Sequence, residues 1–368
     1  MAPSPLLTPF TLGGDLSLKN RMVMAPMTRG RAGDSQCPDA MMARYYVQRA
    51  SAGLIITEGT FISHVANGWV GAPEIYSPAA TAGWKEVTDK VHAAGGLIFC
   101  QLWHCGRASH SSFHPAEGHA VAPSAIAINE PTIHTPIGKV PHEVPAALTV
   151  DGIKAQVADF ATAAANAKAA GFDGVEIHGA NGYLIDSFLQ TKTNKRTDKY
   201  SGESLEGRFR FLKEVLEAVL EVWPANRVGV RLSPNGVYND QGSPDFREAF
   251  PWFVKQLDAY KLAYIHLLIG LGFGFHKLGE PMVMADFRKI TSTPLIANCG
   301  YTKESGEKEI ADGFADLISY GRPWITNPDL PARFESEADL AEDPPVSIWY
   351  SPGPKGYVDY PNADGTVV

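Results

Sequence analysis

The hydrophobic positions of this chain fall into short continuous runs, rich in β-branched side chains, that usually end in Gly, Pro or a polar residue. Continuous rather than alternating hydrophobicity is typical of strands in a parallel sheet that is covered on both faces. The runs predict eight strands: Met22–Met27, Leu54–Glu58, Leu97–Trp103, Gly174–His178, Val228–Ser233, Tyr264–Ile269, Pro294–Asn298 and Ala315–Tyr320.

Between most of these runs lie longer segments in which apolar residues recur with helical spacing. They predict helices over Met41–Ala52, Gly83–Ala94, Asp151–Ala170, Ser204–Val222, Phe246–Tyr260 and Lys303–Asp312. Strand and helix in repeated alternation favour a closed parallel barrel of the TIM type. An open doubly wound sheet is the alternative. Against it, no G-x-G-x-x-G follows the first strand, and Gly270, Gly272 and Gly274 come late without opening a helix.

Two further segments complete the predicted architecture. Pro9–Arg21 indicates a β-hairpin that turns at Gly13 and Gly14 and caps the bottom of the barrel. Gly106–Thr149 is long and aperiodic, so we expect it to form a functional cover over the barrel mouth after the third strand. The fold class is therefore α/β, a single (β/α)8 TIM barrel with an N-terminal hairpin cap and a long excursion, and residues 1–368 are expected to form one domain.

Composition limits the partners of this chain. A net charge of −8 without any Lys/Arg run argues against nucleic acid. Four scattered cysteines offer neither a disulfide framework nor a C-x2-C metal pair, which fits a reducing compartment. The start of the chain lacks the pattern of a secretory signal, and the longest apolar stretch, Leu262–Phe275, is too short and too interrupted to span a bilayer. We expect a cytoplasmic protein that binds small molecules and not membranes.

The segment His178–Tyr183 follows a predicted strand and places two hydrogen-bond donors and a phenol at its end. His178 and Asn181 could polarise one substrate oxygen, as the donors of an oxyanion hole do. The phenol of Tyr183, with an ordinary pKa of about 10, stays protonated at neutral pH and can give a proton to a carbanion. A plain turn in which Tyr183 packs on the barrel rim is the alternative that the hexapeptide alone leaves open.

In a barrel of this type the strand ends together form the active site. Here they read Ala25-Pro-Met-Thr-Arg29, Glu58-Gly-Thr60, Gln101-Leu-Trp-His104, His178-Gly-Ala-Asn181, Arg231-Leu-Ser-Pro234, Asn298-Cys-Gly-Tyr301 and Gly321-Arg-Pro323. With Asn20–Arg29, Gln48–Gly59, Gly171–Leu184, Asn194–Asp198 and Gly356–Pro361, the chain resembles the old yellow enzyme family over essentially its whole length. Having Thr at position 28 and Asn at position 181, the chain resembles the classical, His/Asn branch of that family.

The resemblance implies tightly bound, non-covalent FMN. The residues that it implies along the flavin are Ala25, Pro26, Met27, Thr28, Gly59, Gln101, Arg231 and Trp349. Those that it implies around the phosphate are Cys299, Gly300, Gly321 and Arg322. Thr28 would tune the flavin potential, and Arg231 would neutralise charge on the reduced ring. No metal is assigned to the site.

The resemblance also implies an FMN-dependent ene-reductase of the NADPH dehydrogenase or enoate reductase type. NADPH, with NADH as the alternative reductant, would supply the electrons that reduce the C=C bond of enones, enals and nitroalkenes. His178 and Asn181 would hold the substrate oxygen and Tyr183 would donate the proton, while Trp69, Trp103, Tyr238 and Tyr350 would line the substrate pocket. The family implies a monomer or a homodimer.

This sequence departs from the family pattern at three places. Cys299 stands where Gly or Ala is usual, the run Tyr200–Arg208 is one residue longer, and the glycine-rich segment Gly270–Gly279 differs from most relatives. Because this last segment is expected to border the pocket, the substrate preference does not carry over.

Two other functions remain alternatives. One is a metal-dependent hydrolase that uses His104, His110, His114 and Glu117 at the barrel mouth. The other is a flavin-binding protein that senses or stores flavin without turnover, although the intact Tyr183 and the substrate-side donors argue against it.

Overall fold

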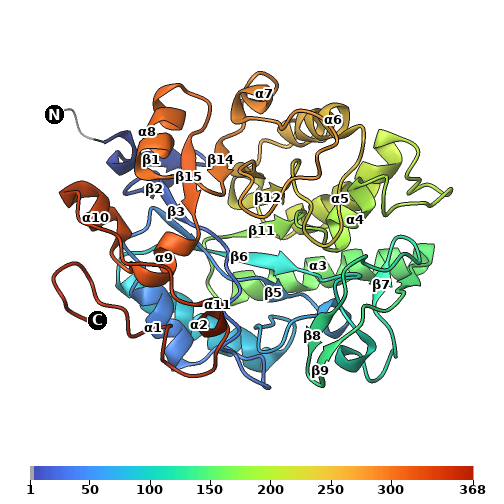
Figure 1. The fold of residues 1–368 in the computed structure, drawn as a ribbon, viewed down its shortest axis with the longest axis horizontal. Coiled ribbons are helices and arrows are strands. Elements are labelled where there is room, and N and C mark those ends of the chain that lie inside the picture. Colours follow the sequence, from blue (N-terminus) through green and yellow to red (C-terminus); the bar gives the residue numbers. More distant parts are fainter. Residues whose placement is uncertain (1–3, 368) are drawn as a thin grey trace.

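The computed structural model describes residues 4–367, and its centre is a closed ring of parallel strands (Figure 1). The eight strands of the ring are β3 (Met22–Met24), β4 (Leu54–Ile56), β6 (Ile98–Trp103), β11 (Gly174–His178), β12 (Val228–Leu232), β13 (Tyr264–Leu268), β14 (Leu295–Asn298) and β15 (Leu317–Tyr320). Pairing runs in this order, and β15 returns to β3, with Ser319 opposite Val23. The predicted TIM barrel is confirmed, and all eight predicted strands are present.

Helices surround the ring, and the three longest start where a side-chain cap satisfies one of the first free backbone N–H groups. Ser77, Thr149 and Ser204 accept hydrogen bonds from backbone N–H groups at the starts of α2, α3 and α5. The helices are α1 (Ala40–Val47), α2 (Pro78–Ala93), α3 (Val150–Ala169), α4 (Leu184–Leu189), α5 (Leu205–Leu220), α6 (Phe246–Asp258), α7 (Met284–Arg288), α8 (Lys303–Ala311), α9 (Arg322–Thr326), α10 (Leu330–Ser336) and α11 (Val346–Trp349).

All six predicted helices are present, with ends that differ by a few residues. The five that periodicity missed, α4, α7, α9, α10 and α11, have four to seven residues each, too few to display a helical repeat. Four short 3-10 turns accompany them: η1 (Pro5–Leu7), η2 (His64–Ala66), η3 (Ser111–Phe113) and η4 (Ala225–Arg227). Among residues 4–367, no helix combines the length and the apolar character needed to cross a membrane.

The N-terminal hairpin closes the bottom of the barrel, as predicted. Strands β1 (Phe10–Leu12) and β2 (Leu16–Leu18) pair antiparallel, and Gly13 and Gly14 between them take the positive φ angles of 58° and 86° that side chains disfavour. The hairpin buries Leu12, Leu16 and Leu18 against the starts of the barrel strands. This apolar plug leaves only the opposite end of the barrel open to a ligand.

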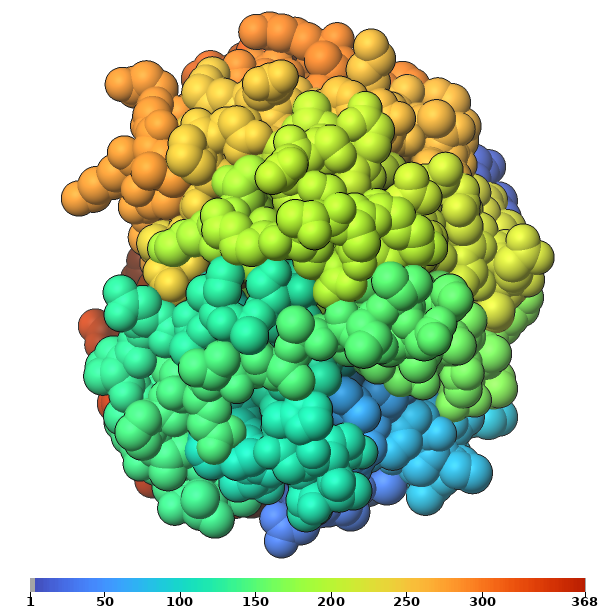
Figure 2. All heavy atoms as spheres, turned by 90° about the vertical axis from the view of Figure 1, so that its right-hand side faces the viewer, coloured from blue at the N-terminus to red at the C-terminus, as the bar shows by residue number. Residues whose placement is uncertain are grey.

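The excursion between β6 and α3 is more ordered than its sequence indicated. It contains η3, a hairpin of β8 (Ile133–Thr135) and β9 (Gly138–Val140), and the paired strands β7 (Val121–Ala122) and β10 (Ala146–Ala147). In Figure 2 it occupies the lower part of the face, next to the segment that follows β11. Arg107 donates to the carbonyls of Asn239 (2.8 Å) and Asp240 (3.1 Å), which joins the excursion to the loop after β12.

The expectation that the excursion covers the barrel mouth is wrong in one respect. No described residue of Gly106–Thr149 lines the cavity at the strand ends. The excursion instead lies beside the mouth and supports the loop that carries Tyr238, which does line the cavity. The sequence could not reveal the position of the excursion, because the path of a long loop depends on the residues that it contacts elsewhere in the fold.

The last residues of the chain pack against α1. Tyr357 stacks on Tyr45 with 4.1 Å between ring centroids, and Gln48 donates to the carbonyl of Val358 at 3.0 Å. Arg29, which is buried, donates to the Gly356 carbonyl at 2.8 Å and so ties the end of the chain to the loop after β3. These contacts position α11 and the aromatic residues at its end.

Arg49 is a buried cation that joins α1 to α9. Its Nε and one terminal nitrogen donate to the carbonyls of Trp324 (2.8 Å) and Ile325 (2.9 Å), and its other terminal nitrogen donates to that of Tyr45 (2.8 Å). Its guanidinium also lies 3.8 Å from the centroid of the Tyr45 ring. The three carbonyls have lost contact with water, so they depend on this one side chain.

Replacing Arg49 by Met should therefore destabilise the fold, because the apolar side chain leaves buried carbonyls unpaired. We expect the free energy of unfolding to fall by about 3 kcal/mol, measured by urea denaturation. Lys85→Met is the control, since Lys85 forms an exposed helical ion pair with Asp89 that contributes at most about 0.5 kcal/mol. Equal losses in the two variants would contradict the role given to Arg49.

Candidate active site

A cavity of about 460 Å³ opens at the carboxyl ends of the barrel strands, a size in the usual range for small-molecule sites. Because the strands are parallel, their ends meet there even though they are far apart in sequence. Fifteen of the residues predicted for cofactor or substrate line it: Ala25, Pro26, Met27, Thr28, Trp69, Asn181, Tyr183, Arg231, Tyr238, Cys299, Gly300, Gly321, Arg322, Trp349 and Tyr350. The predicted site is thus largely assembled in one place.

Four of the predicted residues do not line this cavity: Gly59, Gln101, Trp103 and His178. Gly59 packs so closely on the Trp103 ring that a Cβ would clash with it. Trp103 itself is buried and stacks on Phe61, 4.9 Å between centroids, so it supports the site from below rather than forming the substrate wall predicted for it. Gln101 donates to the carboxylate of Glu176 at 2.7 Å.

His178 stands at the end of β11, and its hydrogen bond defines which nitrogen carries the proton. The backbone N–H of Ala180 donates to Nδ1 of His178 at 3.3 Å. Burial, and next the charge of Arg231, lowers the pKa of His178 well below its ordinary value. The ring is therefore neutral at neutral pH, with its proton on Nε2. His178 does not itself line the cavity, but its ring lies 5.0 Å from that of Tyr183, which does, so its N–H is available to a ligand that extends to this end of the site.

The turn after β11 holds Asn181 at the cavity. Asn181 adopts a positive φ of 59°, its backbone N–H donates to Ser233 Oγ (2.8 Å), and its carbonyl accepts from Asn239 (2.8 Å). Gly182 follows with φ of 72°, and a Cβ there would lie 2.7 Å from the Tyr238 carbonyl oxygen, so only glycine fits. With its backbone fixed on both sides, Asn181 is held in place in the wall of the cavity.

Tyr183 is nearly buried at the same end of the cavity. Its ring meets those of His178 and Trp103 edge-on, each with 5.0 Å between centroids. Burial, followed by the neighbouring phenol of Tyr238, raises the pKa of Tyr183 well above its ordinary value. The phenol therefore keeps its proton throughout the neutral range and acts as an acid toward a strongly basic partner.

A buried charge network lies under the cavity. Arg231, at the end of β12, donates to the side-chain oxygen of Asn298 at 2.7 Å. Glu176 Oε2 lies 2.8 Å from Nδ1 of His266, and neither side chain is exposed. Burial alone would raise the pKa of Glu176, but His266 and Arg231 hold it below the ordinary value. Glu176 thus stays ionised and balances the charge that Arg231 brings to the cavity.

Sequence reasoning missed several residues of the cavity wall. Arg29, Asn298 and Tyr301 belonged to the strand-end motifs but received no role, and Phe273 lay in the glycine-rich segment expected to border the pocket, which it does. The remaining lining residues are Gly272, Ser319, Tyr320, Pro323, Ile325 and Asp343. Nothing in the sequence pointed to Asp343 as a cavity residue, because it follows the last predicted strand and no motif contains it.

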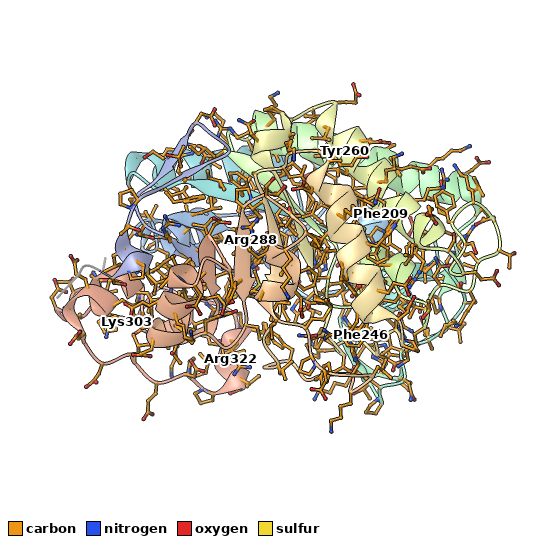
Figure 3. The ribbon with its side chains drawn as sticks, turned by 90° about the horizontal axis from the view of Figure 1, so that it is seen from above. Phe209, Phe246, Tyr260, Arg288, Lys303 and Arg322 are labelled. Atoms are coloured by element: carbon orange, nitrogen blue, oxygen red, sulfur yellow. The ribbon has the colours of Figure 1, made fainter. Side chains whose placement is uncertain are left out.

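The donor set of the cavity fits a flavin with a phosphate group. Nε of Arg231 and Oγ of Ser319 are buried there without a hydrogen-bond partner among the described residues, so a polar ligand would satisfy both. At another part of the wall, Gly300 leaves open space and Arg322 is exposed at the start of α9, where Figure 3 shows it near the edge of the molecule. Its guanidinium lies 5.4 Å from the Trp349 ring centroid. An exposed guanidinium beside an open glycine position suits a phosphate.

The proposed metal hydrolase ligands do not come together. His104 uses both ring nitrogens inside the fold, with Gln156 (2.9 Å) and with the N–H of Gly106 (3.0 Å). His110 is likewise engaged, with Ser112 and with Glu143 at 3.1 Å. Of the four residues, His114 and Glu117 are neighbours, but they lie with His64 and none of them lines the cavity.

Residues 5–341 match the model of the NADH:flavin oxidoreductase / NADH oxidase family. The chain belongs to this family. It is thus a flavin oxidoreductase of the old yellow enzyme type, which confirms the resemblance seen in the sequence.

Among curated relatives, a putative 12-oxophytodienoate reductase 11 of Oryza sativa subsp. japonica is 40% identical over 365 residues, 97% of each chain. A probable flavin mononucleotide-dependent alkene reductase of Leishmania infantum is 40% identical over 363 residues, again 97% of each chain.

Solved structures give the same result. Morphinone reductase superposes with a TM-score of 0.92 at 40% identity, covering 99% of this chain and 97% of that one. The old yellow enzyme homologue from Zymomonas mobilis also reaches 0.92, at 43% identity, covering 97% of this chain and 99% of that one.

Replacing Glu176 by Gln tests the buried network, because the amide keeps the shape but removes the charge that opposes Arg231. We expect the free energy of unfolding to drop by about 3 kcal/mol, measured by urea denaturation of the flavin-loaded protein. Glu86→Gln serves as the control, since Glu86 forms only an exposed pair with Lys90. A Glu176→Gln protein as stable as the control would show that Arg231 needs no buried counter-charge.

Proposed function

We propose that this protein is an FMN-dependent ene-reductase that uses NADPH to reduce the C=C bond of α,β-unsaturated carbonyl or nitro compounds. One observation carries the proposal: at and just after the end of β11, a neutral His178 with its proton on Nε2 stands beside the protonated phenol of Tyr183, and Asn181 lines the same cavity as Tyr183. Two donors for an oxygen and one acid for a neighbouring carbon are what reduction of an activated alkene requires.

In this proposal Ala25, Pro26, Met27 and Thr28 would hold the flavin ring, and Arg231 would supply positive charge to it. Gly59 and Gln101 would shape the pyrimidine end of its site, and Trp349 the benzenoid end. Gly300, Gly321 and Arg322, with Cys299 beside them, would hold the phosphate. When bound, FMN supplies the hydride chemistry that no protein side chain provides. The cavity wall, with the unpaired Nε of Arg231 at its base, supports this placement.

The chain's own residues position and protonate the substrate. His178 and Asn181 donate to the carbonyl or nitro oxygen, which draws electron density from the alkene. Tyr183 then gives its proton to the α carbon, and its raised pKa ensures that the proton is present beforehand. Trp69, Tyr238 and Tyr350 form the walls above, where Trp69 and Tyr350 meet edge-on with 5.3 Å between centroids.

The reductant and the alkene share one cavity in this scheme, so they bind in turn. A relative supports a nicotinamide as a ligand: a structure of morphinone reductase in complex with tetrahydroNAD superposes with a TM-score of 0.90 at 41% identity. We propose NADPH as the reductant, with NADH as the alternative. Comparing flavin reduction rates with the two nucleotides distinguishes them.

The first experiment records the visible spectrum of the purified protein, adds NADPH without oxygen and then adds cyclohexenone. Under the proposal the flavin band bleaches with NADPH and recovers with the enone. Bleaching without recovery would favour a sensing or storage role for the flavin. A protein without a flavin band, even after FMN is supplied, would refute the cofactor assignment.

Tyr183→Phe should separate the two half-reactions. Without the phenol proton, we expect oxidation by cyclohexenone to slow by about 10²- to 10⁴-fold, while flavin reduction by NADPH stays nearly unchanged. Anaerobic stopped-flow absorbance measures each step. Tyr260→Phe, just after the end of α6 and outside the cavity wall, is the matched control and should leave both steps intact. Equal loss in both half-reactions would remove Tyr183 from the role of proton donor.

The double variant His178→Ala, Asn181→Ala should bind phenols poorly. Phenolates place an oxygen where the substrate oxygen is expected, and without the two donors this charged oxygen is buried unpaired. We expect the dissociation constant to rise at least about tenfold, measured from the change in the flavin spectrum on titration. If phenol affinity did not change, these two side chains would not form the oxygen site.

A further inference from the structure

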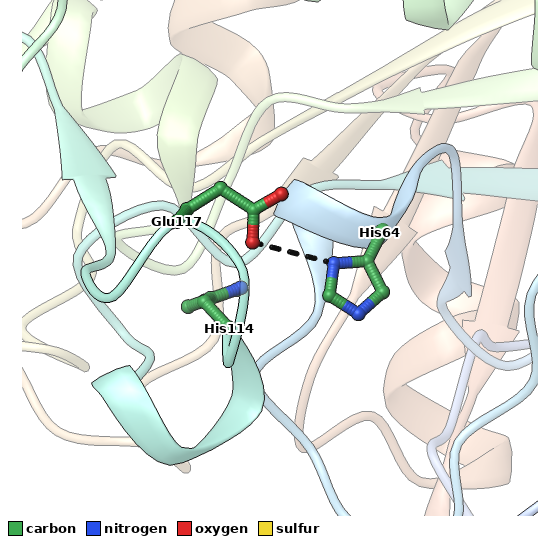
Figure 4. Close-up of side chains that lie close together, drawn as sticks. All are labelled: His64, His114 and Glu117. Atoms are coloured by element: carbon green, nitrogen blue, oxygen red, sulfur yellow. Dashed lines mark ion pairs between the residues drawn. The ribbon is translucent and has the colours of Figure 1, made fainter.

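A second group of chemically active side chains lies outside the cavity. His64, in η2, and His114 and Glu117, at and after the end of η3, each offer a ligand atom, and these three atoms lie within 4.8 Å of one another. Nδ1 of His64 is 3.5 Å from a carboxylate oxygen of Glu117. Figure 4 shows a ring nitrogen of His114 directed toward the space between the other two side chains. None of the three lines the proposed active site.

The hydrogen bonds around His114 leave one ring nitrogen free. Ser109 Oγ donates its proton to the carbonyl of Asn67 at 2.6 Å, so it can only accept from Nε2 of His114, 2.8 Å away. The proton of His114 is therefore on Nε2, and Nδ1 carries a lone pair. This Nδ1 is buried and has no hydrogen-bond partner among residues 4–367.

An unpartnered lone pair in a fully buried side chain costs free energy unless a ligand uses it. The His64–Glu117 ion pair explains the positions of two side chains but leaves Nδ1 of His114 without a function.

We propose that His64, His114 and Glu117 bind one divalent metal ion of the zinc class, with a water as the fourth ligand. Two imidazoles and a carboxylate are ligands that zinc favours, and three protein ligands leave its tetrahedral shell open at one position. Ser109 acts as the outer partner that orients His114 and fixes its tautomer.

The geometry needs only a small adjustment. Bonds of about 2.1 Å place tetrahedral ligand atoms roughly 3.4 Å apart. The side chains of His64 and Glu117 are 45% and 32% exposed, so they can turn inward, and an ion can enter from solvent. The buried His114, held by Ser109, is the fixed member of the set.

The ion would join two segments that are distant in sequence. His64 belongs to the loop after β5 (Thr60–Phe61), whereas His114 and Glu117 belong to the excursion after β6. The loop after β5 continues to Trp69, a wall residue of the cavity. The site is therefore structural: it fastens the excursion beside the barrel mouth. It is independent of the proposed function, since no ligand of the ion touches the cavity.

The test is a zinc titration of the flavin-loaded holoenzyme after treatment with a chelator. Isothermal titration calorimetry, with metal analysis after equilibrium dialysis, should show one zinc per chain and a rise in Tm on binding. His64→Ala and Glu117→Gln should each weaken binding at least about tenfold. Ser109→Ala should weaken it about 10- to 100-fold. X-ray absorption should show nitrogen and oxygen ligands without sulfur.

His92→Ala is the matched control, because His92 also pairs with a carboxylate, Asp173 at 2.9 Å, but the described part of the chain offers it no third metal-ligating group. Its zinc affinity should equal that of the wild type. Since His64 and Glu117 are partly exposed, their variants fold even if His114→Ala does not. Absence of zinc binding by the wild type, unchanged affinity in His64→Ala and Glu117→Gln, or a sulfur ligand in the absorption spectrum would each overturn the proposal.

Discussion

Closure of the strand ladder is the constraint on which the rest of this structure depends. The hydrogen bonds from β15 back to β3, and from β6 to β11, force eight strand ends from the whole length of the chain into one ring. A strand end exposes polar backbone and accepts polar side chains at little cost, whereas a polar side chain in the strand interior needs buried partners. Function therefore concentrates at this edge. The hairpin of β1 and β2 plugs the opposite edge with leucines, so only one mouth is available to a ligand.

Beneath the mouth, charge replaces apolar packing. Glu176, His266 and Arg231 come from three consecutive barrel strands, β11, β13 and β12, and lie in the interior without water. An ionised carboxylate in such a place is stable only because a cation and hydrogen-bond donors surround it. The same arrangement keeps a positive charge at the base of the cavity. Burial, and next the charge of Arg231, lowers the pKa of His178, which makes that ring a neutral donor rather than a second cation.

The periphery follows a different principle. The excursion has few long strands of its own, and polar contacts hold it in place. Arg107 donates to a carbonyl of the loop after β12, and Arg196 donates to the carbonyl of Pro123 at 3.0 Å. Such contacts are individually weak and can be strengthened by a bound ion. A metal at His64, His114 and Glu117 would act on this part of the molecule and leave the barrel unchanged. The excursion contacts both the loop that carries Trp69 and the loop that carries Tyr238. How well the excursion is ordered therefore affects the shape of the cavity that these two side chains line.

The sequence by itself determined the barrel, the hairpin plug and most of the cavity wall, because each depends on a local pattern: apolar runs, helical spacing, the Gly13-Gly14 turn and the polar residue that ends each strand. Tertiary structure alone decided what depends on partners distant in the chain. Trp103 lies beneath the site because Gly59 lets it approach, the excursion lies beside the mouth because Arg107 finds Asn239, and His64 joins His114 across the fold. The proton of His178 is on Nε2 because a backbone N–H approaches Nδ1, and no residue pattern encodes which nitrogen a folded chain leaves free.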